Sequence, residues 1–223
     1  MKEEFWVLEA SGATQFAEWS ESVHYGDKVL CPLVSGHSRP GRRSNPLSVE
    51  LPSRLRDFMW TGMSECLVQD RVVELFEQDS VTGYALSEVE ASFRKPSKLP
   101  PPRLRELLVR GWGGLAPPSS GVRLLESCPG CGHRVYSTFS SPLKLIDPSA
   151  WDGSDVFMVW PLPRFIMVTT KVANLIERAE LTGAALIPIS QLHTQGDTLT
   201  PGSLSDWFPS EEAARLGSKI GIE

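Results

Sequence analysis

Two cysteines separated by two residues and followed by a glycine form the most distinctive short pattern in this 223-residue sequence. In Cys128-Pro-Gly-Cys131-Gly132 both thiolates can face one ion, because the glycine permits a tight turn. Zinc would need two further ligands in a tetrahedral arrangement. A thioredoxin-like redox pair is the alternative, but it expects a helix after the motif, whereas residues 133–139 resemble a strand. The pattern therefore favours a zinc knuckle on a hairpin.

The ligands that would complete such a site come from a related segment in the first part of the chain. Cys31-Pro32 and Gly36-His37 repeat the start and the end of the knuckle, but Ser35 stands where a second cysteine is expected. Serine is a poor zinc ligand, so the predicted ligands are three thiolates and one histidine: Cys31, Cys128 and Cys131, with His37, His133 or His24. Three interpretations stay open: one structural zinc, a degenerate site without metal, and a redox or catalytic thiol pair. We expect no other cofactor.

An internal repeat indicates how the two knuckles are positioned. Residues 67–86 align without a gap with residues 167–186, and eight of the twenty positions are identical. Three shorter matches precede this one in the same order along the chain: 57–60 with 155–160, 44–53 with 140–149, and 31–37 with 128–133. Four ordered matches are hard to obtain by chance, so the sequence predicts two tandem copies of a unit of roughly 95 residues.

The predicted organisation follows from this repeat and from a proline-rich basic stretch between its copies. It comprises four parts: a first unit over residues 1–93, a linker over 94–102, a second unit over 103–193, and a C-terminal tail over 194–223. The tail is expected to contain a short helix with Ser210 as its N-cap and Gly217 as its end.

The residue patterns within each unit predict an α+β fold with mainly antiparallel strands and one main helix per copy. Apolar residues recur at helical spacing after a short apolar strand in both copies: Val72, Leu75 and Phe76, and Val172, Leu175, Ile176 and Ala179. Asp70 is a candidate N-cap of the first helix, and Thr169 or Thr170 of the second. Three residues are expected in the core: Trp60, Cys66 and Trp160.

Catalytic motifs are missing from the sequence. It contains no Walker loop, no H-E-x-x-H, no G-x-S-x-G and no dinucleotide-binding glycine pattern. Residues 111–114, Gly-Trp-Gly-Gly, lack the lysine of a phosphate loop and are expected to form a turn. The four histidines occupy no recognisable catalytic spacing. We therefore expect a protein that is not an enzyme.

Composition and charge narrow the compartment and the partners. The chain is 41% hydrophobic and 22% charged, as in ordinary folded proteins, and its net charge of -5 weighs against binding nucleic acid or anionic membranes non-specifically. It lacks an apolar run long enough to span a membrane. The N-terminus, MKEEFWVLEASG, lacks the features of a signal peptide, so we expect a cytoplasmic protein without a membrane partner.

Charge is segregated along the chain. Residues 65–92 contain seven acidic residues and one basic residue, a net of -6, whereas residues 94–110 contain six basic residues and one acidic residue, a net of +5. Asp70, Glu74 and Glu77 form either a solvated helix face or a docking surface for a basic partner. The basic stretch suggests an alternative function, a zinc-ribbon-like nucleic-acid-binding or regulatory protein, against which the overall negative charge counts.

The motifs together resemble the double-CXXCG paralogous family of myxobacteria. The resemblance rests on the two knuckles, on D-F-x-W at residues 57–60, and on the V-x-x-[RK]-V-x-x-L pattern that ends in [VL]-T-G. It covers most of the chain, from about residue 29 to about residue 192. Residues 160–168, W-P-L-P-R-F-I-M-V, followed by L-T-G, are similar to a broader class of bacterial immunity domains. The first knuckle departs from the family pattern at Val34-Ser35.

The resemblance implies a function in competition between bacteria. Immunity proteins bind a cognate toxin, block it and catalyse nothing. The acidic balance of the chain would suit a basic toxin such as a nuclease. Interfaces of this kind differ from pair to pair, so the resemblance assigns no toxin-binding residue.

Overall fold

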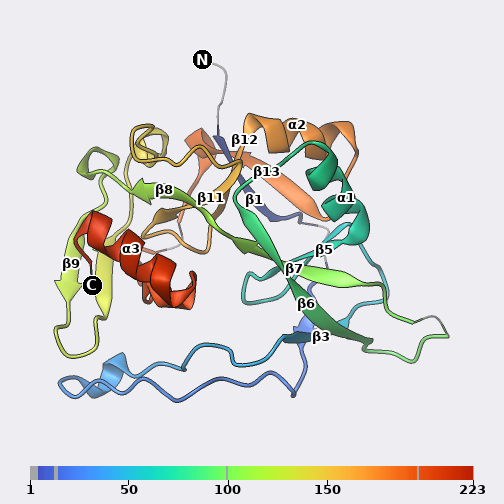
Figure 1. Ribbon diagram of the computed structural model, residues 1–223, viewed down its shortest axis with the longest axis horizontal. Helices are drawn as coiled ribbons and strands as arrows, with labels where there is room; N and C mark the ends of the chain where they lie inside the picture. The colour runs from blue at the N-terminus through green and yellow to red at the C-terminus, as the bar shows by residue number, and fades with distance from the viewer. Residues whose placement is uncertain (1–4, 13–14, 99, 195, 223) are drawn as a thin grey trace.

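The computed structural model describes residues 5–12, 15–98, 100–194 and 196–222. It confirms the predicted α+β class: strands that are mostly antiparallel are combined with three helices (Figure 1). The helices are α1 (Asp70–Gln78), α2 (Thr170–Arg178) and α3 (Ser210–Ile220). In the described part of the chain, none of the helices has the length and apolar character needed to cross a membrane. Met1–Glu4, which open the segment tested for a signal peptide, lie outside the described residues.

The two predicted units are called the halves below: residues 1–93 form the first half, and residues 103–223, with the tail, form the second. The larger sheet has six strands, and most of them come from the first half. Its order is β2 (Glu18–Trp19), β3 (Leu47–Leu51), β6 (Tyr84–Phe93), β7 (Leu104–Val109), β5 (Cys66–Gln69) and β4 (Phe58–Trp60). Only the pairing of β3 with β6 is parallel within this sheet. The predicted linker lies in the connection between the antiparallel strands β6 and β7.

The other two sheets belong mainly to the second half of the chain. The five-stranded sheet has the order β13 (Ala184–Pro188), β1 (Phe5–Ala10), β12 (Ile166–Thr169), β11 (Val156–Trp160) and β8 (Gly111–Leu115), with β11 and β8 parallel. The three-stranded sheet has the order β14 (Thr198–Leu199), β10 (Arg134–Ser137) and β9 (Leu124–Ser127). The hairpin of β9 and β10 presents the second knuckle.

Each half of the chain contributes its first strand to the sheet of the other half. Strand β1 pairs with β12 and β13, and β7 pairs with β5 and β6. The two sets of pairings have the same register: Trp6 lies opposite Pro188, and Arg105, 99 residues after Trp6, lies opposite Glu88, 100 residues before Pro188. Equivalent positions therefore make equivalent pairings, although the tandem duplication itself stays a prediction.

A shared hydrophobic core joins the two halves. It combines matching residues of α1 and α2 that are buried against both sheets: Val72, Phe76, Val172 and Ile176. The helices lie side by side (Figure 1), and Arg178 of α2 forms an ion pair of 2.7 Å with Asp79 at the end of α1. Trp60, Cys66 and Trp160 are buried, as the sequence predicts. Burial of this apolar surface is the main stabilising contribution to the fold.

Reciprocal polar contacts join the halves at the surface of this core. Asp57 accepts hydrogen bonds of 2.7 Å from both the amide and the hydroxyl of Thr182. Asp155, the equivalent of Asp57, accepts bonds of 3.0 and 3.2 Å from the amide and hydroxyl of Thr82. Such a reciprocal arrangement is what a two-fold interface between copies produces.

The predicted helix ends need three corrections. Asp70 is the first residue of α1 rather than its cap, which is Gln69. Thr169 occupies the N-cap position of α2, but its hydroxyl donates to Asp155 and makes no capping bond. The N-cap of the last helix is Pro209 rather than Ser210, which is its first residue, and the helix continues through Gly217 to Ile220. A side chain at Gly217 would collide with the Ile222 carbonyl, so that glycine serves close packing instead of ending the helix.

The expectation of a turn at residues 111–114 is wrong, because these residues form most of β8. Added β-carbons at Gly111 and Gly113 would lie within 3 Å of atoms in β11, its parallel neighbour. Gly111 therefore allows the two backbones to approach closely, which is a recognised use of glycine in strands, and Gly113 leaves room for the side chains of Phe157 and Val159.

Residues 20–46, called the arm below, run along one side of the molecule as an irregular hairpin (Figure 1). Isolated bridges join Tyr25 to Arg43 and Val29 to Arg39. None of the arm residues is buried. A 3-10 turn, Ser35–His37, lies at the far end of the arm and carries the first knuckle.

Candidate metal centre

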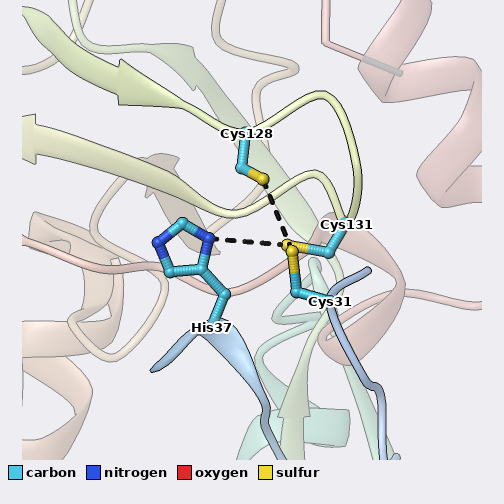
Figure 2. Close-up of side chains that lie close together, drawn as sticks. All are labelled: Cys31, His37, Cys128 and Cys131. Carbon is cyan, nitrogen blue, oxygen red and sulfur yellow. Dashed lines mark hydrogen bonds between the residues drawn. The ribbon is translucent and has the colours of Figure 1, made fainter. Parts of the chain in front are cut away.

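The two knuckles meet at one cluster of four side chains. Cys31 and His37 come from the end of the arm, and Cys128 and Cys131 come from the loop between β9 and β10. Figure 2 shows the four side chains pointing toward one another from these two segments. Their ligand atoms all lie within 4.8 Å of one another, so the cluster can hold a metal ion. The structure thus brings the three predicted thiols together with His37, one of the three candidate histidines.

Backbone hydrogen bonds shape each knuckle. The amide of Val34 donates to the Cys31 sulfur at 3.3 Å. In the second knuckle the amide of Gly132, which has a φ of 68°, donates to the Cys128 carbonyl at 2.9 Å. The Cys128 amide in turn donates to the carbonyl of His133 at 2.8 Å. These tight turns direct the thiol groups toward a common point.

The separations within the cluster match a tetrahedral metal site. With zinc–sulfur bonds of about 2.3 Å, the edges of a tetrahedron are about 3.8 Å long. The sulfurs of Cys31 and Cys128 are 3.6 Å apart, and the Cys131 sulfur is 3.8 Å from Nδ1 of His37. All three thiols are free. None of them is held in a disulfide, so all three remain available as metal ligands.

The second ring nitrogen of His37 has a carboxylate partner. Its Nε2 lies 3.3 Å from Oε1 of Glu126, in β9. Metal-binding histidines commonly donate their other N–H to a carboxylate, which fixes the ring and strengthens the ligand. No spacing rule points to Glu126, because its role depends on where the arm docks.

The other two candidate histidines have different positions. The ring of His133 stacks on that of His37, with 4.2 Å between ring centres and 27° between planes. His24 is exposed in the arm, where its amide donates to Asn45 at 2.9 Å. Ser35 is exposed in the 3-10 turn. The structure therefore selects His37 from the three alternatives. The ring of His133 packs against the ring of His37 and supports it.

Electrostatics within the cluster favour a bound cation. Desolvation raises the pKa of Cys31, but hydrogen bonds from the amides of Leu33 and Val34 and from the two neighbouring thiols outweigh it and lower the pKa to about 6. The pKa of Cys131 is raised, by desolvation first and also by Cys31 and Cys128. Neighbouring thiolates repel one another, so complete ionisation of the set requires a positive charge between them.

The fourth cysteine lies outside this cluster. Cys66 is buried in β5, with 2% of its surface exposed. Desolvation, with a smaller contribution from Glu106, raises the pKa of its thiol strongly. A buried, protonated thiol is neither a ready ligand nor a nucleophile. The prediction that Cys66 is a core residue is confirmed.

The predicted partner-binding residues form an exposed group distant from the knuckles in sequence. Asp70, Glu74 and Glu77 are exposed on α1, and none makes an ion pair with a described residue. The equivalent residues of α2 are less acidic: Thr170, Asn174 and Glu177. Exposure makes the α1 face available to a partner, while its role in binding stays a prediction.

The basic stretch at residues 94–110 has much of its charge paired inside the molecule. Arg94 forms an ion pair with Glu18 at 2.9 Å. Arg103 and Arg105 both pair with Glu88, at 3.3 and 3.2 Å. These arginines are therefore less available to nucleic-acid phosphates than the sequence suggests.

Comparison with known proteins gives no relative for this arrangement, since no family model and no curated protein matches the chain.

Proposed function

We propose that this chain is an immunity protein: a cytoplasmic, non-catalytic protein that neutralises a cognate bacterial toxin by binding it directly. The observation that carries the proposal is the meeting of both knuckles at one four-ligand cluster. The resemblance to the double-CXXCG family rests in part on those two knuckles. Their convergence on one cluster means that the two motifs would act together as a single site.

We further propose that the cluster holds one structural zinc ion. Three thiolates and an imidazole are ligands that zinc prefers, and four protein ligands would complete its tetrahedron. A catalytic zinc site keeps one position open for water or substrate. A closed set of four ligands therefore supports a structural role and agrees with a protein that catalyses nothing.

The zinc would fix the arm to the rest of the molecule. With no buried residue, the arm gains little from the hydrophobic effect. Zinc binding can replace a core in such a segment, because the binding free energy contributes directly to folding. Cys31 and His37 on one side and Cys128 and Cys131 on the other would then be linked across the two halves.

Metal analysis of the purified full chain tests the zinc proposal. We expect close to one zinc per chain, and less than about 0.2 would contradict it. His37→Ala should lower the zinc content and weaken its retention against a chelator. His24→Ala is the matched control, because it removes an exposed histidine of the same arm and should leave the zinc content unchanged.

The acidic face of α1 is our proposed contact for a basic toxin. Asp70, Glu74 and Glu77 are exposed and lack intramolecular ion-pair partners among the described residues. Complementary charges accelerate association and select among partners. A positively charged toxin, such as a nuclease, would be attracted to this face.

Co-expression with the toxin encoded beside its gene tests the immunity proposal. We expect rescued growth and a complex that elutes together in size-exclusion chromatography. Asp70→Thr with Glu74→Asn should weaken the complex, because these changes copy the α2 residues onto α1, whereas Glu177→Gln on α2 should not. If the unmodified protein gives no rescue and forms no complex, the proposal is rejected. Salt-sensitive DNA or RNA binding in its place would favour the zinc-ribbon alternative.

A further inference from the structure

A cleft separate from the metal cluster lies between the arm and the body of the protein. Its volume is about 700 Å³, which is within the range of small-molecule sites. The walls come from residues 39–46 of the arm, from β7, from residues 63–66 between β4 and β5, and from residues 200–207 of the tail. Segments that are distant in the sequence therefore converge on one space.

Positive charge predominates in this cleft, although the whole protein is acidic. Three carboxylates are among its lining residues: Glu65, Glu106 and Asp206. Five arginines are among them as well: Arg39, Arg42, Arg43, Arg110 and Arg164. These eight groups carry a net charge of +2, against -5 for the chain as a whole.

The carboxylates of the cleft already have partners. Asp206 accepts two hydrogen bonds from Arg39, at 2.8 and 2.9 Å. Glu106, which is only 4% exposed, pairs with Arg43. Glu65 accepts hydrogen bonds from two neutral donors, Thr61 and Trp19. Two of the five arginines are thus neutralised within the protein.

The other three arginines have no carboxylate partner among the described residues. Arg110 is half-buried and donates to the main-chain carbonyl of Trp207 at 2.9 Å. Arg164 donates to the carbonyl of Met63 at 3.1 Å, and its guanidinium lies 5.8 Å from the centre of the Trp207 ring. Arg42 is exposed and forms no ion pair with a described residue. The main-chain carbonyls hold the guanidinium groups of Arg110 and Arg164 without neutralising their charge.

Two of these arginines also disfavour each other. Burial is the main cause that lowers the pKa of Arg110, and Arg42 adds to the effect, while Glu212 and Glu106 oppose it. Placing like charges together at a partly desolvated position costs free energy. An anion bound in the cleft would offset the repulsion between these two arginines.

We propose that this cleft binds a small phosphorylated ligand through Arg42, Arg110 and Arg164. The planar guanidinium matches the geometry of phosphate oxygens and can donate two parallel hydrogen bonds. A doubly charged phosphate would balance the net charge of the lining residues. Tyr25, which also lines the cleft and is 42% exposed, can stack on a flat ring. Inorganic pyrophosphate and a nucleotide share this phosphate chemistry.

Calorimetric titration of the full chain with pyrophosphate and with adenosine diphosphate tests the proposal. We expect both to bind, with an affinity that falls as the salt concentration rises. Arg42→Gln and Arg164→Gln should each weaken binding by about tenfold or more, because each removes charge-assisted hydrogen bonds. Tighter binding of the nucleotide would indicate that Tyr25 stacks on the base, and equal binding would indicate a site for phosphate alone.

Arg103→Gln is the matched control. Arg103 is an exposed arginine outside the cleft, where it pairs with Glu88 at 3.3 Å. It should retain the affinity of the unmodified protein, and an equal loss in this variant would overturn the proposal in favour of diffuse charge attraction. The absence of binding by either ligand up to about 5 mM would also overturn it. Thermal unfolding of every variant checks that the fold is retained, and the exposed position of Arg42 makes Arg42→Gln the safest substitution.

Discussion

The two halves of the protein start their knuckle segments in the same way and then hold them differently. The amides of Ala17 and Ala116 each donate 2.7 Å hydrogen bonds to equivalent carbonyls, those of Trp60 and Trp160. From this point the first half continues into the arm, none of which is buried. The second half instead buries several residues before and after its knuckle: Val122, Tyr136, Leu145 and Ile146.

Because of this difference, the four-ligand cluster contributes more to holding the arm than to holding the second knuckle. The second knuckle is anchored by its own hairpin, in which the hydroxyl of Tyr136 accepts a 3.1 Å hydrogen bond from Trp160 in the core. The tail, including α3, packs against the same core. The arm is fixed to the body mainly by the ion pairs of Arg39 and Arg43 and by the knuckle at its end. The same strand pairings are therefore compatible with an autonomous hairpin in one half and a dependent arm in the other.

Removal of the proposed zinc should give the largest effect and should act on one half only. Structural zinc sites bind with apparent free energies on the order of 10 kcal/mol, and the arm has no core to compensate for such a loss. We expect chelation to make the arm sensitive to trypsin, at Lys28, Arg42 and Arg43, while Arg134 in the second hairpin remains protected. The far-ultraviolet circular dichroism should change little.

His24→Ala provides the control for this experiment, because its arm should be released by chelation in the same way as that of the unmodified protein. Continued protection of the arm without metal would show that the ion pairs suffice to hold it. Unfolding of the whole chain would show that the second half depends on the metal as well. Either result would remove the contrast between the halves.

Removal of one indole N–H from each half should have the next largest effect. The indole of Trp60 donates to the carbonyl of Gly183 across the two halves at 3.0 Å, whereas Trp160 donates to Tyr136 within the second half. Trp60→Phe and Trp160→Phe should each lower the free energy of unfolding by about 2 kcal/mol, since each removes one buried hydrogen bond and the packing of part of a buried ring. Denaturant unfolding measures this loss.

Hydrogen exchange then distinguishes the two substitutions. Trp60→Phe should increase exchange around Gly183 and β13, and Trp160→Phe should increase it in β9 and β10. The same exchange pattern in both variants would mean that the two tryptophans stabilise one common core, and the distinction between contacts across and within the halves would fail.

The parts of the structure predicted from sequence are those that depend on neighbouring residues. The spacing of Val172, Leu175 and Ile176 predicts α2, because helical periodicity is local. The exchange of β1 and β7 between the sheets is not predictable in this way, since alternation along a strand does not identify its partner. The turn expected at the β8 glycines is wrong for a similar reason: their close contact with β11 is not local.

The candidate site shows the same division. The C-P-G-C-G spacing predicts a knuckle, and the repeat predicts that Cys31 contributes to it. Selection of His37 from three histidines depends on the path of the arm, which no local pattern specifies. The arginine-lined cleft is a still stronger case, because Arg42, Arg110 and Arg164 are brought together only by the complete fold.

The reciprocal aspartates should give the smallest effect, one that the two halves share. Burial raises the pKa of Asp57, but the hydrogen bonds from Thr182 and the charge of Arg71 outweigh it and hold the pKa below its usual value. In Asp155 burial is likewise outweighed, first by Lys171 and then by Thr82 and Thr169, and the pKa is also lowered. A folded-state pKa below the unfolded value of about 3.9 means that unfolding takes up protons in acid.

The stabilisation from both aspartates is therefore complete above the unfolded pKa and is lost as the pH falls through the lower folded pKa. We expect the thermal midpoint of the unmodified protein to fall below about pH 4. Asp57→Asn and Asp155→Asn should each be less stable at pH 7 by about 1 kcal/mol, and each should lose less stability in acid than the unmodified protein. Any metal release at low pH affects all three proteins, so the difference between them isolates the aspartates. Similar effects of the two substitutions would indicate that the halves are equivalent where they meet, and an effect confined to one aspartate would limit that equivalence to the backbone.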